Sequence, residues 1–163
     1  MKNLLALFAL LFAYTSTFAV EITSDKDDDW EDTDTWDLGV LPTNGDVIII
    51  EAGTTVTVTT NNTDCDGAPA THLYIRGTLT FTNGSKLNLG CGSSITVEPG
   101  GLIDGGSGGG SSKKIFICGT EEWNSGDPDV VGPATFGSPL PISLLSYEVS
   151  VTDFDEVLVE WAT

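Results

Sequence analysis

The chain has 163 residues, enough for one domain and a fragment of a second. It carries 24 acidic against six basic residues, a balance that repels nucleic acid and anionic lipid and excludes both as partners. His72 and Arg76 are its single histidine and single arginine, so the side chains available for acid–base catalysis are few. Abundant Gly with frequent Asn, Thr and Asp predicts short β-strands joined by tight turns.

Residues 1–19 have the pattern of a signal peptide. Lys2 precedes an apolar run that ends at Ala13, and small side chains stand one and three residues before a cut after Ala19. A single membrane anchor is the alternative, but polar residues 14–17 interrupt a run that is already too short to span a bilayer. We therefore expect an exported chain that does not insert in a membrane once the signal is removed.

Residues 20–44 are expected to form an acidic segment and an N-terminal cap. The apolar side chains suited to cover the first coil are Trp30, Trp36, Leu38 and Leu41. The acids are dense between Asp25 and Asp34 and could hold Ca²⁺. Their spacing fits no EF-hand loop, so we favour a solvated acidic linker and expect no metal site.

Residues 45–120 alternate apolar and outward positions in short runs separated by turns, most of them glycine-containing. The apolar pairs at i and i+2 are Val56/Val58, Leu73/Ile75, Leu79/Phe81, Leu87/Leu89, Ile95/Val97 and Ile115/Ile117. Each run is long enough only for a strand of three to five residues. A threonine, an asparagine or, at Tyr74 and Phe116, an aromatic residue stands between the two members of each pair.

The turns between these strands also repeat. Residues 50–56 align with 75–79 and with 97–102, which places Val56, Leu79 and Leu102 at intervals of 23 residues. This period is typical of solenoids, in which each coil is stacked on the next and completes its neighbour's core. We predict an all-β fold, a short right-handed parallel β-helix of three to four coils. A β-sandwich is the competing fold.

A stack of coils has two open ends that need covers, because unpaired strand edges aggregate. Besides the N-terminal cap, we expect the segment after Gly119 to contribute to the second cover. Residues 121–163 are otherwise expected to be a linker followed by a partial immunoglobulin-like β segment.

The three cysteines are spaced close to one coil apart. Cys65, Cys91 and Cys118 are separated by 26 and 27 residues, and adjacent rungs bring Cα atoms near the distance that a disulfide needs. We favour a Cys65–Cys91 bond, with Cys91–Cys118 and three reduced cysteines as alternatives. No Cys-x-x-Cys pair is present, so metal binding by these residues is not expected.

Two stretches resemble known families. Residues 30–39 and 41–50, followed by 53–58, are similar to the opening of the G-eight domain, a glycine-rich β-helical module of secreted surface proteins of the Bacteroidetes. The likeness covers about residues 30–120. Residues 140–147 and 157–163 resemble the first strands of an immunoglobulin-like segment in proteins exported by the type nine route. Those proteins continue into a sorting domain, whereas this sequence stops at Thr163, so we rely on the signal peptide alone for export.

An enzyme is the least favoured function. Glu51 and Glu98 occupy equivalent turn sites two coils apart, a spacing that could mimic an inverting glycosidase pair. Arg76 lies between them, so a surface ladder of alternating charges is the preferred interpretation. The glycine- and serine-rich loop at 105–112 lacks a phosphate-binding pattern, and we expect no cofactor.

Three surface features are candidates for binding. A two-rung array of outward threonines at 55–59 and 78–82 could bind ice, but the third coil breaks it. Trp123 and the outward Tyr74 are weak candidates for stacking on sugars. Tyr74 and Phe116 are interpreted first as packing against Leu144, Leu145 and Tyr147.

The sequence therefore predicts a secreted or bacterial cell-surface module that is structural or adhesin-like and non-catalytic. A carbohydrate-binding module is the alternative, and a fragment of a polysaccharide-degrading enzyme comes third. Its expected partners are glycans or other cell-surface components, and its oligomeric state is left open.

Overall fold

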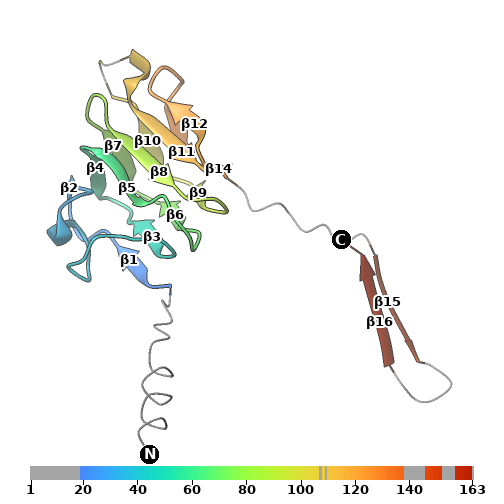
Figure 1. Ribbon diagram of the computed structural model, residues 1–163. Helices are drawn as coiled ribbons and strands as arrows, with labels where there is room; N and C mark the ends of the chain where they lie inside the picture. Colours follow the sequence, from blue (N-terminus) through green and yellow to red (C-terminus); the bar gives the residue numbers. More distant parts are fainter. Residues whose placement is uncertain (1–18, 107, 109, 138–145, 152–156, 163) are drawn as a thin grey trace, which may run out of the picture.

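The computed structural model describes residues 19–137 except 107 and 109, together with the backbone of 146–151 and 157–162. The described chain is a β-solenoid of about four turns, as predicted. The colours of Figure 1 run in order from blue at one end of the stack to orange at the other, because successive coils lie on one another. The expected signal peptide, apart from Ala19, lies outside the described residues.

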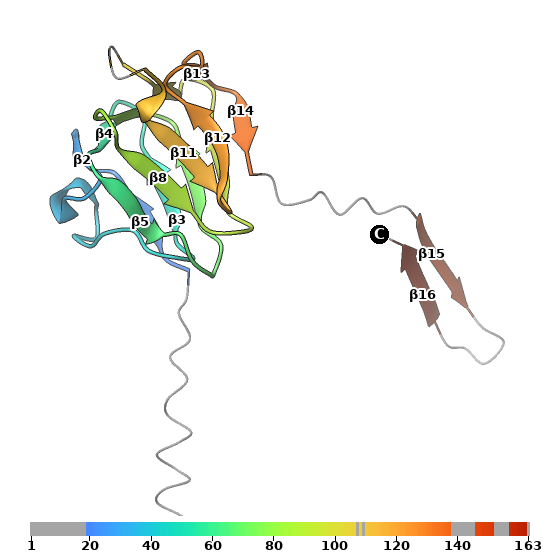
Figure 2. The same cartoon turned by 45° about the horizontal axis from the view of Figure 1, so that its top comes forward.

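Three sheets form the sides of the solenoid. The first sheet contains β1 (Glu21–Thr23), β3 (Val47–Ile50), β6 (His72–Ile75), β9 (Ser94–Val97) and β14 (Ala134–Phe136). The second sheet contains β2 (Asp28–Asp29), β4 (Thr55–Val58), β7 (Thr78–Phe81), β10 (Leu102–Asp104) and β13 (Val130–Val131). The third sheet contains β5 (Asn61–Cys65), β8 (Lys86–Leu89), β11 (Lys114–Ile117) and β12 (Thr120–Asn124), and Figure 2 shows its strands side by side.

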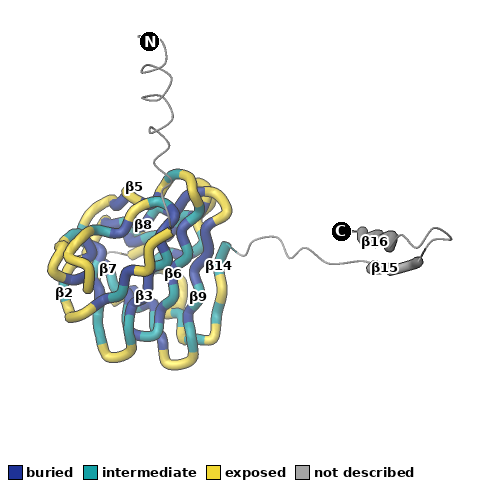
Figure 3. The backbone as a smooth tube through the Cα atoms, turned by 90° about the horizontal axis from the view of Figure 1, so that it is seen from below, coloured by how far each residue is buried: buried dark blue, intermediate teal, exposed yellow. Residues whose placement is uncertain are grey.

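Alternation along each strand builds the core. Parallel pairing places Ile22, Ile48, Leu73 and Ile95 in one inward column of the first sheet, all at most 2 % exposed. Equivalent columns from the other two sheets fill the space between them, and Figure 3 shows buried residues along the strands with exposed residues at the turns. Each coil thus buries its apolar face only because a neighbour lies about 4.8 Å away.

The register of the third coil differs by one residue from the prediction. Val56 pairs with Leu79 as expected, but Leu79 pairs with Ile103, and Leu102 lies beside Thr78 on the outer face. The turn from Val97 to Ile103 has the same length as the turn from Ile50 to Val56 in the first coil. The equivalent turn of the second coil, from Ile75 to Leu79, is two residues shorter. Because a one-residue slip moves a side chain to the opposite face, the interval of 23 to Leu102 was misleading.

A column of glycines explains one corner of the solenoid. The N–H of Leu102 donates to the carbonyl of Gly77, and the N–H of Gly132 donates to the carbonyl of Gly101. A Cβ atom at Gly77 would lie 2.3 Å from the Glu51 carbonyl oxygen, and one at Gly101 would lie 2.0 Å from that of Ile75. Only glycine therefore permits the backbones of adjacent coils to approach this closely.

The chain reverses direction at the end of the third coil. Cys118 and Gly119 have φ angles of +52° and +74°, as in the two-residue turn that favours β-hairpins, and β12 then pairs antiparallel with β11. Next, β13 and β14 pair antiparallel with β10 and β9. The segment after Gly119 therefore covers this end, as expected, and its strands pair with the solenoid as far as Phe136.

Two tryptophans close the opposite end. Trp30 and Trp36 are buried and pack edge to face with ring centroids 5.1 Å apart, which confirms them as cap residues. The indole Nε1 of Trp36 donates to the carbonyl oxygen of Trp30 at 3.0 Å. Leu41 is partly buried against the core, whereas Leu38 is 51 % exposed and does not serve the cap.

At this end, acidic side chains accept hydrogen bonds from backbone N–H groups that have no neighbouring strand to pair with. Asp27 accepts a hydrogen bond from the N–H of Thr55 at 2.6 Å, and Glu31 accepts from the N–H groups of Thr59 and Thr60. In a longer stack, carbonyls of a preceding coil would accept these bonds. The segment that we interpreted as a solvated linker is therefore in part a hydrogen-bonded cover, which the spacing of the acids did not reveal.

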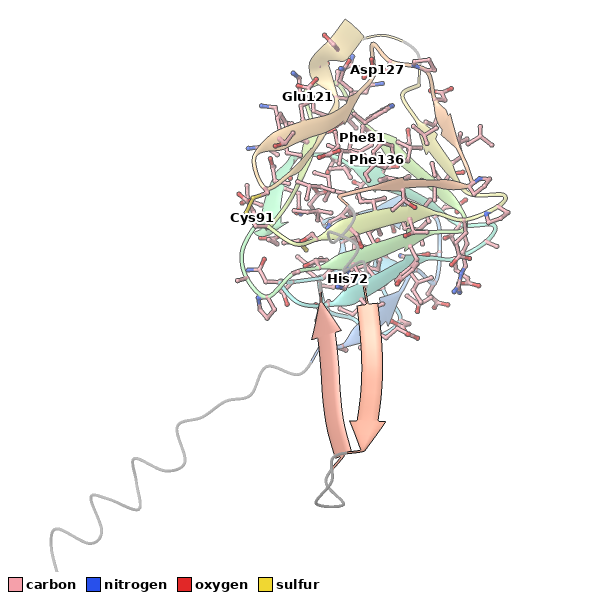
Figure 4. All side chains as sticks on the ribbon, turned by 90° about the vertical axis from the view of Figure 1, so that its right-hand side faces the viewer. His72, Phe81, Cys91, Glu121, Asp127 and Phe136 are labelled. Carbon is pink, nitrogen blue, oxygen red and sulfur yellow. A yellow bond between two sulfur atoms is a disulfide. The ribbon has the colours of Figure 1, made fainter. Side chains whose placement is uncertain are left out.

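The disulfide joins Cys91 to Cys118, so the favoured Cys65–Cys91 pairing is wrong and the alternative is correct. Cys65 pairs in register with Leu89 and points into the core, where it is fully buried and free. Cys91 comes two residues after Leu89, in an exposed turn at the edge of the fold in Figure 4. The register between adjacent strands therefore determines which cysteines form the disulfide. The spacing of the cysteines in the sequence does not.

The C-terminal strands β15 (Ser146–Val151) and β16 (Val157–Ala162) form an antiparallel pair. The expected contact of Tyr74 and Phe116 with Leu144, Leu145 and Tyr147 involves side chains outside the described residues. The immunoglobulin-like character of this segment stays a prediction.

Candidate functional site

The outer faces of the three sheets carry different chemistry. Threonines dominate the second sheet, where Thr55 lies beside Thr78 and Thr57 beside Thr80. Lysine and asparagine dominate the third sheet. The outer face of the first sheet mixes apolar side chains such as Ile49 and Tyr74 with polar ones such as His72. Tyr74, the aromatic candidate for binding, therefore has both apolar and polar neighbours.

Tyr74 occupies the middle of that face. Its neighbours on adjacent rungs are Ile49 and Thr96. Ile49 is only 7 % exposed although its side chain points outward, and Tyr74 itself is half-buried. A half-exposed phenol beside an aliphatic neighbour provides a flat surface with a polar edge, which suits stacking on a sugar ring or on a partner's side chain.

A hydrogen-bonded polar pair lies beside Tyr74 on the same face. Nδ1 of His72 and the hydroxyl of Ser94 form a hydrogen bond at 2.9 Å, and the apolar Val47 lies beside His72 on the preceding rung. The other ring nitrogen of His72 has no partner among the described residues. The first sheet therefore offers a hydrogen-bonding group two residues before Tyr74, on the same strand and the same face.

Trp123 does not accompany Tyr74 on this face. It lies on β12, is 3 % exposed and packs on Phe81 with ring centroids 5.6 Å apart. Its Nε1 donates to the carbonyl oxygen of Pro128 at 3.2 Å. A buried ring offers no face to a solvent-borne sugar, so Trp123 takes the role at the C-terminal end that Trp30 and Trp36 have at the other.

The predicted charge ladder is present. Arg76 donates from Nε to Glu98 at 3.0 Å and from Nη1 to Glu51 at 3.1 Å. The hydrogen bond to Glu98, followed by the one to Glu51, raises the pKa of Arg76. Both carboxylates are thus bound to one cation at the corner of the first and second sheets.

The third sheet holds an ion pair that the sequence did not indicate. Lys114 on β11 pairs with Glu121 on the antiparallel β12, and its Nζ lies 5.9 Å from the centroid of the Phe116 ring. This hydrogen bond to Lys114 lowers the pKa of Glu121. Phe116, expected to face outward, is half-buried here beside the lysine. The chain reversal creates the pair, so only a prediction of the hairpin could have found it.

The threonine array has two rungs, as expected, and the third coil interrupts it with Leu102 and Asp104. The hydroxyl of Thr80 donates to the carbonyl oxygen of Asp104 at 3.2 Å. Within residues 19–137, apart from the two left out, no three His, Cys, Asp or Glu side chains gather as metal ligands. In the same part of the chain no helix has the length and apolar character needed to cross a membrane.

These observations define a class. A capped β-solenoid with an exposed disulfide and distinct outer faces is an extracellular structural module. The model of the G8 domain matches residues 35–128, more than half of the chain, and the protein belongs to this family. G8 domains are extracellular. Neither the curated proteins nor the solved structures include a match to this chain.

Proposed function

We propose that this chain is a non-catalytic, adhesin-like module of an exported bacterial surface protein, in which a rigid solenoid presents the outer face of the first sheet. The observation that carries the proposal is that caps close both ends of the stack while Tyr74 stays half-exposed in the middle of a side. Closed ends leave the sides as the surfaces available for contact.

The state of the coil carboxylates favours a non-catalytic role. A glycosidase needs one carboxyl group that is free to donate a proton to the glycosidic oxygen. Glu51 and Glu98 are both ion-paired to Arg76, so each already has a partner on the protein. Release of reducing ends from a polysaccharide, abolished by Glu98→Gln but not by Glu122→Gln, would contradict the proposal and support the degrading enzyme.

Adherence tests the adhesin-like role directly. Cells that display the chain are expected to adhere to host cells or to surface glycans more strongly than cells without it. Tyr74→Ser should reduce this adherence, whereas Thr57→Ser on the second sheet should not. Equal adherence of cells with and without the chain would overturn the proposal.

Carbohydrate binding is the second candidate function. It is favoured by one arrangement, the phenol of Tyr74 beside the His72–Ser94 pair, because sugar sites combine a stacking ring with nearby hydrogen-bonding groups. A glycan array should then give saturable binding that Tyr74→Ala abolishes and Phe116→Ala on the third sheet preserves. If both variants still bind, the sugar site lies away from Tyr74 and Phe116. If the parent chain binds no glycan, carbohydrate binding is excluded and only the structural role remains.

A further inference from the structure

The first sheet engages the chain from Val20, directly after the expected cleavage site. The carbonyl oxygen of Val20 accepts from the N–H of Val47 at 2.8 Å, and β1 continues this pairing from Glu21. Ala19 is exposed. The residue at which the fold begins is therefore the residue that becomes the first one when the signal peptide is cut after Ala19.

The nitrogen of Val20 lies against a buried carboxylate. Its N–H donates to Oδ1 of Asp46 at 3.3 Å, and Asp46 is only 6 % exposed. The other carboxylate oxygen, Oδ2, accepts from the N–H and the hydroxyl of Thr43 at 2.8 and 3.1 Å. Thr43 thus fixes the carboxylate through one oxygen, and the second oxygen is directed at the nitrogen of Val20.

Asp46 has the only charged side chain around a hollow at this end of the fold. The hollow has a volume of about 330 Å³, and its other lining residues are Val20, Ile22, Val40, Leu41, Thr43 and Asn44. The three donors that Asp46 meets are uncharged, and hydrogen bonds to a carboxylate become stronger when the donor is also ionised. A positive charge on the nitrogen of Val20 would therefore be stabilised by Asp46 without any rearrangement.

Cleavage after Ala19 supplies this charge. Hydrolysis breaks the bond between the carbonyl carbon of Ala19 and the nitrogen of Val20, and water adds a hydroxyl to the carbon and a proton to the nitrogen. The new amino group takes up a further proton below about pH 8 and becomes an ammonium group.

We propose that Asp46 is the receptor for the amino terminus that this cleavage creates, so that processing during export completes the N-terminal cap. The ammonium group replaces the amide N–H beside Oδ1 and turns a hydrogen bond into an ion pair. The pair fixes the start of β1, which covers the edge of β3. The inference rests on the export that the proposed function includes, but not on the adhesin-like role or on Tyr74.

The pairing predicts a loss of stability at alkaline pH. Because the ammonium group gains a partner on folding, its pKa is higher in the folded state. Its contribution is complete below the unfolded value near 8 and is lost as the pH rises through the folded value. The titratable side chains on the surrounding strands are those of Glu21, His72 and Cys65. Carboxylates and imidazoles titrate below this range, and burial raises the pKa of the Cys65 thiol to about 12.

Unfolding of two chains that differ only at the amino terminus tests the pairing. One chain begins at Val20 and the other at Thr17, so that three further residues separate the ammonium group from Asp46, and both run to Thr163. In urea at pH 7 the chain from Val20 should have a folding equilibrium constant roughly tenfold larger, as expected for a charged in place of a neutral donor. At pH 9.5 the two constants should be nearly equal.

A pair of variants shows whether Asp46 is responsible. Asp46→Asn should remove the difference between the two chains at pH 7. The matched control is Asp37→Asn, because Asp37 also accepts from a backbone N–H of β1, that of Thr23 at 2.9 Å, but lies away from the amino terminus. This variant should leave the tenfold difference intact. Equal stability of the two parent chains at pH 7, or a difference that Asp46→Asn preserves, would overturn the proposal.

Two measurements on the parent chain do not depend on whether Asp46→Asn folds. NMR of the chain from Val20, ¹³C-methylated at its amino terminus, should show the amino group titrating at a pH about one unit above that in the urea-unfolded chain, which corresponds to the tenfold difference. Titration at the same pH in both states would overturn the proposal. Mass spectrometry of the exported chain should give Val20 as the first residue, and any other amino terminus would also overturn it. Loss of adherence or its persistence in Tyr74→Ser changes none of these results, so the two proposals fail separately.

Discussion

The carboxylate of Glu31 accepts two hydrogen bonds from Thr59, one from its N–H at 3.1 Å and one from its hydroxyl at 2.7 Å. Two more come from Thr60. One side chain thus covers the corner at which the first coil passes from the second sheet to the third. Burial opposes ionisation of Glu31, but the hydrogen bonds from Thr59 and Thr60 outweigh it and lower its pKa.

This contact predicts a pH-dependent contribution to stability. Because the pKa of Glu31 is lower in the folded state, its contribution is present above the unfolded value near 4.5 and is lost as the pH falls through the folded value. Glu31→Gln should reduce the free energy of unfolding by ~1–2 kcal/mol at pH 7, allowing for solvent screening. Urea unfolding at pH 7 and pH 3 should show the difference shrinking in acid. Asp34→Asn is the control, and an equal loss there would contradict the capping role.

Thiol counting tests the disulfide. Burial raises the pKa of the Cys65 thiol to about 12, so the native chain should not react with a thiol reagent, and the unfolded chain should expose one thiol. A Cys65–Cys91 bond would instead leave Cys118 exposed and reactive in the native state. Replacing Cys91 and Cys118 together by serine should lower stability by about 3–4 kcal/mol for a loop of this length.

Two neighbouring substitutions test the register of β10. Ile103 is fully buried in the column of Val56 and Leu79, so Ile103→Ala should reduce the free energy of unfolding by about 3 kcal/mol. Leu102→Ala removes a side chain beside Thr78 on the outer face and should cost less than about 1 kcal/mol. Denaturant titration measures both, and the reverse order would restore the register predicted from the interval of 23.

Trp123 should matter for stability and not for sugar binding. Trp123→Ala removes the ring that packs on Phe81 and should destabilise the chain by about 3–5 kcal/mol. Phe116→Ala, a half-buried aromatic on the next strand, serves for comparison and should cost clearly less. A Trp123→Ala protein with unchanged unfolding and reduced glycan binding would return Trp123 to the binding surface.

Local signals in the sequence determined the strands and the kind of fold. The pairs Leu73/Ile75 and Leu87/Leu89 alternate because inward side chains must be apolar, and the repeated turns between them indicate coils. The charge ladder followed from the same alignment, since Glu51, Arg76 and Glu98 share one turn position. Trp30 and Trp36 could be assigned to a cap because they precede the first coil.

Tertiary structure alone decided the register of the third coil, the disulfide and the surface available for binding. Turn lengths vary between coils, so Ile103 rather than Leu102 enters the core, and Cys65 meets Leu89 rather than Cys91. The reversal at Cys118 buries Trp123 and folds residues 120–136 over the open end. Alternation and spacing report which face of a strand is apolar, but which rung meets which depends on backbone pairing between segments distant in sequence.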